Sequence, residues 1–208
     1  ELDCNNNHIT SLNIANLTNL QTIHCQGNTM NSLTLTNLPA LTLIDCVSNQ
    51  LTTMSFSGLP ALEFLQCYAN HLQSLNLASI PSLKYLGCQD NQLTALDLSS
   101  SANLEGLSCS NNPLNTLDVS VLPNLVGLGA NYTGISTINL SGLTHLENIS
   151  LIGNYLTELN LNGLSNLTHV NCHSNFLTSL SINGLSNLFY LNCTNNLLPS
   201  IDLTQCPN

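Results

Sequence analysis

Hydrophobic and polar positions along this chain follow one pattern that returns every 21 residues. Starting at Leu20, a leucine recurs at this spacing without insertion or deletion, at Leu41, Leu62, Leu83, Leu104, Leu125, Leu146, Leu167 and Leu188. The unit reads L-x-x-L-x-C-x-x-N-x-L-x-x-L-x-L-x-x-L-x-x. Such a short, strict period is typical of a solenoid, in which each repeat packs only on its neighbours. We predict a single domain over residues 1–208, with a partial repeat over 1–19 and nine full repeats over 20–208.

The first half of each unit predicts a β-strand. Apolar positions four and six alternate with polar positions three, five and seven, which is the period of a half-buried strand. Equivalent strands of successive repeats must stack in parallel, ~4.8 Å apart. An asparagine at position nine, replaced only by Thr133, is expected to turn the chain and to form a buried ladder of hydrogen bonds. The second half leaves room for an extended segment or a short strand.

Two segments of the repeat carry a resemblance to a known family. LKYLGCQDNQL, from Leu83 to Leu93, resembles the conserved segment of leucine-rich repeats. TALDLSSSAN, from Thr94 to Asn103, resembles the variable segment of the 21-residue bacterial subclass called IRREKO. The resemblance implies a curved solenoid with a parallel sheet on its concave face and few or no helices. It also implies a secreted or surface-attached protein of Bacteroidota, extracellular or associated with the outer membrane.

The charge balance excludes several partners. Lys84 is the only Lys or Arg, against 11 Asp and Glu, so the formal net charge is −10. One cation cannot neutralise a phosphate backbone or an anionic lipid surface, so we expect no nucleic-acid binding. No apolar run approaches the ~18 residues of a spanning helix, so we expect no membrane insertion. A hydrophobic content of 43% gives the chain enough apolar surface to bury.

Eight of the nine cysteines occupy position six, an inward position where related repeats place leucine. Equivalent Cα atoms ~4.8 Å apart lie within disulfide range, so bridges between neighbouring repeats stay open as an alternative. We favour reduced thiols, because small buried thiols are common core residues. The chain has no C-x-x-C and no paired ligand spacing. We therefore expect neither a metal nor a cofactor.

The outward strand positions contain the main candidate binding residues. Leu43, Phe64 and Tyr85 share position three of adjacent repeats and form an apolar stripe, with Tyr68 at position seven. Gly106 and Gly127 continue the row without side chains, and a strand glycine often marks close approach by a ligand. An aromatic wall beside a bare floor suits a sugar ring or an extended peptide. The alternative is that strand propensity alone places these aromatics.

A second candidate is a row of alternating charge at position five. Asp3, His24 and Asp45 lie side by side in adjacent repeats. The row is either a pH-sensitive contact or general base, or simply a solvated charge row. If the carboxylates approach the imidazole, they favour its protonated form.

A third candidate lies in the last repeats, where His169, His173 and Tyr190 occupy outward positions near Tyr155, Phe176 and Phe189. The two histidines are ~13 Å apart on one strand and cannot share an ion. The alternative is that the phenylalanines meet a capping element.

No nucleophile elbow, zincin motif, phosphate loop or redox motif is present. We therefore predict a non-enzymatic recognition module that binds glycan, peptide or protein on the concave face. The alternative is a structural spacer or accessory subunit docked on a larger surface complex. Ice binding, suggested by the hydroxyl row Ser32, Thr34 and Thr36, is a distant third. Neither end shows a cap, so we expect a piece of a longer chain with neighbouring domains or subunits at its ends.

Overall fold

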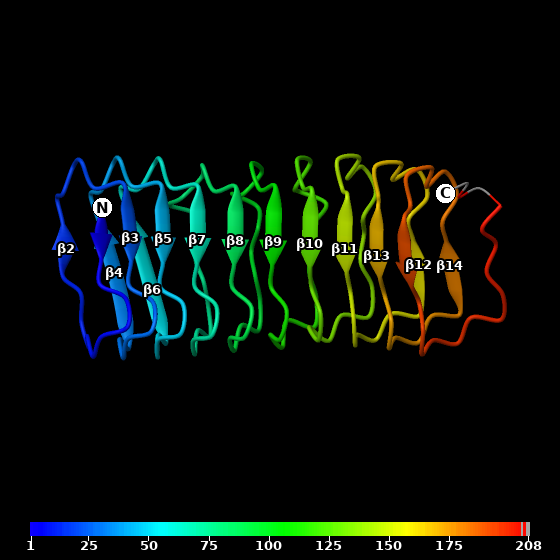
Figure 1. The fold of residues 1–208 in the computed structure, drawn as a ribbon, viewed down its shortest axis with the longest axis horizontal. Helices are drawn as coiled ribbons and strands as arrows, with labels where there is room; N and C mark the ends of the chain where they lie inside the picture. The colour runs from blue at the N-terminus through cyan, green and yellow to red at the C-terminus, as the bar shows by residue number, and fades with distance from the viewer. Residues whose placement is uncertain (205, 207–208) are drawn as a thin grey trace.

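The computed structural model describes residues 1–204 and 206. These residues form 15 short strands in three parallel sheets, and the described part contains no helix. Consequently, none of the described segments is a helix that could cross a membrane. Figure 1 shows an elongated solenoid, with a front row of strands that runs from the N-terminal to the C-terminal end. The predicted parallel solenoid is therefore confirmed.

The front row is one ten-stranded parallel sheet. Its strands are β1 (Leu2–Asp3), β3 (Thr22–His24), β5 (Leu43–Asp45), β7 (Phe64–Gln66), β8 (Tyr85–Gly87), β9 (Gly106–Ser108), β10 (Gly127–Gly129), β11 (Asn148–Ser150), β13 (His169–Asn171) and β15 (Tyr190–Asn192). Each residue pairs with the residue 21 positions later, as Tyr85 does with Gly106. Side chains at repeat positions three, five and seven project outward, and we call this surface the sheet face.

The back of the solenoid carries two smaller sheets. One contains β2 (Ile14–Ala15), β4 (Ser32–Thr36) and β6 (Thr53–Ser57), and the other contains β12 (Glu158–Asn160) and β14 (Ser179–Ser181). The repeats between them are extended but unpaired on this side. In those repeats Asn76, Asp97 and Asp118 accept a hydrogen bond from the backbone N–H two residues later, at 3.0 Å in each case. Asn160 makes the same bond at the end of β12, so this Asx turn occurs in paired and unpaired repeats alike.

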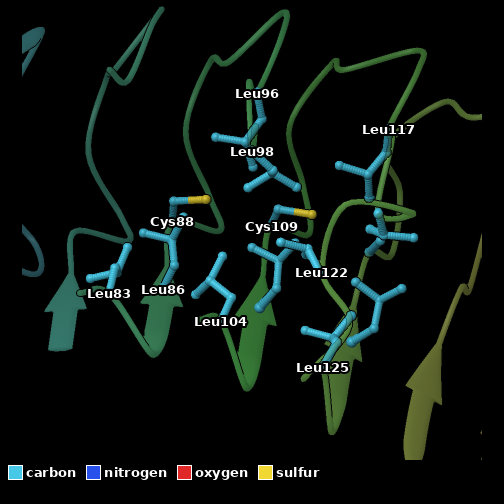
Figure 2. Packing of buried hydrophobic residues seen from close by; sticks show 14 of the residues in the cluster. Leu83, Leu86, Cys88, Leu96, Leu98, Leu104, Cys109, Leu117, Leu122 and Leu125 are labelled. Atoms are coloured by element: carbon cyan, nitrogen blue, oxygen red, sulfur yellow. The ribbon is translucent and has the colours of Figure 1, made fainter. Parts of the chain in front are cut away.

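One apolar core runs along the interior between the front and back layers. Leu83, Leu104 and Leu125 stack repeat on repeat, each with no exposed surface, and Figure 2 shows the thiols of Cys88 and Cys109 among such leucines. The nine cysteines are free thiols, six of them buried. No group of three His, Cys, Asp or Glu among the described residues could hold a metal ion.

The predicted asparagine ladder is present. In Asn112, which is 1% exposed, Nδ2 donates to the carbonyls of Cys88 and Cys109 at 3.0 Å, while Oδ1 accepts from the N–H of Leu93 at 2.9 Å. The other buried asparagines of the column repeat this arrangement. At the single interruption, the Thr133 hydroxyl lies 3.0 Å from Oδ1 of Asn154 and keeps the ladder connected. Each asparagine thus ties its own turn to the preceding repeat.

Candidate functional site

A stacked aromatic pair stands on the sheet face between β7 and β8. The rings of Phe64 and Tyr85 are nearly parallel, with centroids 4.8 Å apart and an interplanar angle of 10°. Leu43 pairs with Phe64 in register on β5, which confirms the predicted apolar stripe. Tyr68 is half-buried and does not join this stack. The pair is a flat, fixed apolar surface of the kind that binds a planar or ring-shaped group.

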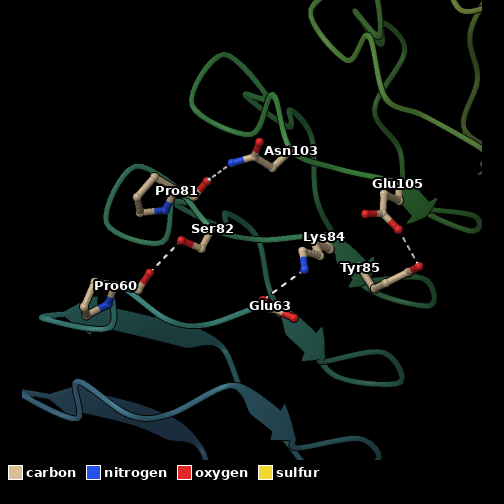
Figure 3. A network of polar contacts seen from close by, with 8 residues as sticks. All are labelled: Pro60, Glu63, Pro81, Ser82, Lys84, Tyr85, Asn103 and Glu105. Atoms are coloured by element: carbon tan, nitrogen blue, oxygen red, sulfur yellow. Dashed lines mark hydrogen bonds and ion pairs between the residues drawn. The ribbon is translucent and has the colours of Figure 1, made fainter.

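A short hydrogen bond holds Tyr85 in place. Its hydroxyl donates a hydrogen bond to Oε2 of Glu105 at 2.6 Å (Figure 3). Glu105 directly precedes β9 in the next repeat. This bond to a carboxylate raises the pKa of Tyr85 above its ordinary value. Sequence reasoning missed Glu105, although its position next to Gly106 places it one repeat beyond Tyr85.

The only cation of the chain is neutralised beside the pair. Nζ of Lys84 lies 3.0 Å from Oε1 of Glu63, and both side chains are more than one-third exposed (Figure 3). An exposed pair of this kind adds little stability. Its consequence here is electrostatic, because the chain retains no free Lys or Arg to attract an anionic ligand.

The strand glycines differ from the bare floor that the sequence suggested. A Cβ at Gly106 would lie 2.8 Å from Cδ1 of Tyr85, so the tyrosine ring covers this glycine. The side-chain amide of Gln66 likewise covers Gly87. At Gly127 a Cβ would meet no atom within 4 Å. The floor is therefore covered at Gly106, where the missing side chain makes room for Tyr85, and open at Gly127.

Beside the pair the sheet face is hollowed. The hollow has a volume of about 280 Å³ and is lined by Gln66, Tyr85, Leu86, Gly87, Gln89, Gly106, Leu107, Ser108 and Gly127. We call it the sheet-face hollow. Sequence reasoning did not single out Gln66, Gln89 and Ser108, although all three occupy outward positions on or next to β7, β8 and β9. Oε1 of Gln89 is buried and accepts no hydrogen bond from the described part of the chain.

Two glycine substitutions should distinguish Gly106, which packs against the Tyr85 ring, from Gly127, which does not. Gly106→Ala is expected to push the Tyr85 ring away from Phe64 and from Glu105, because the new Cβ would overlap the ring. The loss of stacking should appear as a weaker tyrosine signal in near-ultraviolet circular dichroism at pH 7. Gly127→Ala is the matched control and should leave this signal unchanged. Identical spectra for both variants would contradict this packing of Tyr85.

The charged row at position five aligns as predicted but does not form ion pairs. Asp3, His24 and Asp45 are register neighbours on β1, β3 and β5. However, the Lys84–Glu63 contact is the only ion pair found among the described residues. The carboxylates of Asp3 and Asp45 instead accept hydrogen bonds from backbone N–H groups two residues later, at 3.1 and 3.2 Å. The structure thus shows no ion pair between His24 and either carboxylate, in line with the second alternative, a solvated charge row.

Aromatic residues also gather in the last repeats. The His169 ring lies 6.0 Å from that of Tyr190 and 5.7 Å from that of Phe189, which is 82% exposed. Tyr155 and Phe176 stack separately at 6.1 Å. His173 makes a local contact of 2.8 Å between its Nδ1 and Oγ of Ser174. The structure thus brings His169 and Tyr190 together, whereas His173 is bound to its own loop.

Comparison with known proteins identifies the fold. No protein-family model and no curated protein matches this sequence. Among solved structures, the leucine-rich effector protein YopM from Yersinia pestis is 27% identical with a TM-score of 0.80, over 90% of this chain and 53% of that one. The functional domain of InlJ from Listeria monocytogenes, described as including a cysteine ladder, is 22% identical with a TM-score of 0.61, over 98% of this chain and 60% of that one.

A third neighbour is the leucine-rich-repeat protein LIC12759 from Leptospira interrogans, with 22% identity and a TM-score of 0.60 over 89% of this chain. The present chain covers 63% of that protein, so it spans less than two thirds of each of these three neighbours. The 21-residue register and the asparagine ladder indicate the same fold as these structural neighbours. The chain is a leucine-rich-repeat solenoid of the bacterial type.

Proposed function

We propose that this chain is a non-enzymatic recognition module that binds an uncharged ligand on the sheet face. The observation that carries this proposal is the fixed Phe64–Tyr85 pair beside an open hollow of about 280 Å³. Solenoids of this type offer extended surfaces for binding, and their repeats vary at outward positions while the core is kept. The proposed ligand is a glycan, or a segment of peptide or protein.

The electrostatics of the face support an uncharged ligand. The single cation is already paired with Glu63, and Glu105 adds negative charge next to Tyr85. A phosphate, sulfate or carboxylate group would be repelled by Glu105 and would find no unpaired Lys or Arg to bind it. The amide and hydroxyl groups of the hollow can instead both donate and accept hydrogen bonds.

We also propose that the protein acts outside the bacterial cell or on its surface. This proposal rests on the resemblance of the 21-residue repeat to secreted and surface-attached proteins. Fractionation of the producing cells should find the protein in the medium or in the outer-membrane fraction. Recovery from the cytoplasm alone would contradict it.

Removing the aromatic pair should remove binding. An array of uncharged glycans together with a displayed peptide library would supply ligands selected on the wild-type chain. We expect the double variant Phe64→Ala/Tyr85→Ala to bind them about tenfold more weakly or not at all, because apolar contact and ring stacking are lost. Tyr155→Ala is the control, since Tyr155 is 60% exposed and lies near the C-terminal end. Unchanged affinity in the double variant would exclude this part of the sheet face.

A docking role as a spacer or accessory subunit is the second candidate. It is favoured by apolar side chains left exposed in the last repeats, among them Phe189 at 82%, Leu197 at 61% and Leu203 at 50%. In that case substitution of Phe189 should abolish binding of the docking partner, while substitution of Tyr85 should leave that binding unchanged.

A further inference from the structure

The geometry points to the class of ligand: we propose that the sheet-face hollow binds one uncharged pyranose ring of a glycan, stacked on Tyr85. This inference rests on the proposed function and narrows it. It assigns the ring contact to Tyr85 and hydrogen bonding to Gln66, Gln89 and Ser108, and it requires an open position at Gly127.

Phe64 covers one face of the Tyr85 ring, and the other face lies partly over Gly106 and borders the hollow. Phe64 covers the face toward β7, with the rings 4.8 Å apart. The opposite face is turned toward β9 and β10, because the ring lies over Gly106 and lines the hollow together with Gly127. Stacking and the bond to Glu105 fix this orientation before any ligand arrives. The apolar C–H face of a pyranose can therefore lie on the ring face that borders the hollow at little cost in conformational entropy.

The position of the hollow within the sheet argues against an extended peptide. A bound peptide strand gains its affinity from main-chain hydrogen bonds to the free edge of a sheet. The hollow lies over β7, β8, β9 and β10, and each of these strands is paired on both sides. Only β1 and β15 are edges of this sheet. A ligand at the hollow must therefore bind through side chains, as a sugar ring with peripheral hydroxyls does.

The polar groups of the hollow match hydroxyl groups. The side chains of Gln66, Gln89 and Ser108 each offer both donor and acceptor atoms, as a sugar hydroxyl does. Oε1 of Gln89 is buried and receives no hydrogen bond from the described residues, so a ligand hydroxyl would satisfy it once the side chain turns toward the hollow. No positively charged side chain lines the hollow, so the sugar is neutral rather than sialylated, sulfated or phosphorylated.

The size of the hollow limits the ligand to one ring or two. Its volume of about 280 Å³ lies just below the ~300–1,000 Å³ of pockets that take drug-sized molecules. A single terminal sugar fits this space, and the rest of a glycan would extend over the open sheet face.

Filling the hollow without disturbing the aromatic pair gives the sharpest test. The probe is an array of uncharged gluco-, galacto- and manno-oligosaccharides with sialylated and sulfated counterparts, followed by calorimetry on the glycans that bind. In Gly127→Leu the new side chain meets no atom within 4 Å at its Cβ and extends into the hollow. Ser179→Leu on β14, an exposed strand position at the back, is the matched control.

We expect the wild-type chain and Ser179→Leu to bind a set of glycans that share one neutral terminal sugar. Gly127→Leu should bind them at least about tenfold more weakly, with an unchanged near-ultraviolet circular dichroism signal of tyrosine at pH 7. The inference is overturned if only anionic glycans bind, or if Gly127→Leu binds as well as the wild type. Suppose that no glycan binds, but that peptides selected from the library bind the wild-type chain and not Phe64→Ala/Tyr85→Ala. The glycan proposal then fails while the proposed function stands. Glycan binding that is insensitive to both sets of substitutions would overturn both.

Discussion

Raising the pH from 7 to 10 under reducing conditions is expected to lower the free energy of unfolding by about 8 kcal/mol. The cause is the column of six buried thiols. Burial raises the pKa of Cys25, Cys109 and Cys172 from about 9 to about 12, and it raises the pKa values of Cys46, Cys67 and Cys88 as well.

The sign follows from which state loses protons. In the unfolded chain these thiols ionise near pH 9, whereas in the folded chain they stay protonated until much higher pH. Above pH 9 the unfolded state therefore binds fewer protons, and stability falls as pH rises. At pH 10 each thiol contributes a loss of about 1.4 kcal/mol. The stabilising contribution is present below the unfolded pKa and is lost progressively as the pH approaches the folded one.

Urea denaturation at pH 7, 9 and 10 measures this effect. Cys88→Ala should lose about 1.4 kcal/mol of the pH dependence, since one titrating group is gone. Stability that stays constant from pH 7 to 10 would mean that the thiols are oxidised or exposed. It would then favour the bridges between neighbouring repeats that the sequence left open.

The second large effect is expected at the asparagine ladder. Asn112→Ala should lower the free energy of unfolding by about 3 to 5 kcal/mol, because several buried backbone groups lose their partners at once. The N–H of Leu93 and the carbonyl of Cys109 would be left unpaired in the core, and the carbonyl of Cys88 would keep only its bond from Nδ2 of Asn91. Urea denaturation at neutral pH measures the loss.

The control is the same substitution at the surface of the preceding repeat. Asn103 is exposed and donates one hydrogen bond to the carbonyl of Pro81, at 3.1 Å (Figure 3). Asn103→Ala should cost no more than about 0.5 kcal/mol. Similar losses in the two variants would mean that the ladder does not join the repeats.

The sequence predicts the scaffold well because the 21-residue period of the repeat also sets which residues of neighbouring strands pair. Once Tyr85 and Gly106 occupy the same position of successive repeats, a parallel solenoid must pair them, as observed. The ladder is predictable for the same reason, since a buried polar side chain at every turn needs backbone partners close by.

The details of the site could not be predicted, because they depend on where side chains lie across strands. The repeat pattern places Tyr85 beside Gly106 but does not show that the ring covers that glycine or that its hydroxyl reaches Glu105. The pattern likewise aligns Asp45 with His24 but does not show that the carboxylate accepts a hydrogen bond from the N–H of Val47 in its own loop. Backbone geometry was also missed at position eight, where even Ala69 and Tyr132 adopt left-handed φ angles of 53° and 52°.

Recognition is expected on the sheet face at the Phe64–Tyr85 pair. A crystal structure of the chain with a glycan selected on the array would show whether it occurs there. We expect a sugar ring in the hollow, in contact with Tyr85 and above Gly127, within hydrogen-bond distance of Gln89. A ligand seated on the back strands, or against Phe189 at the C-terminal end, with the hollow free of sugar, would contradict it.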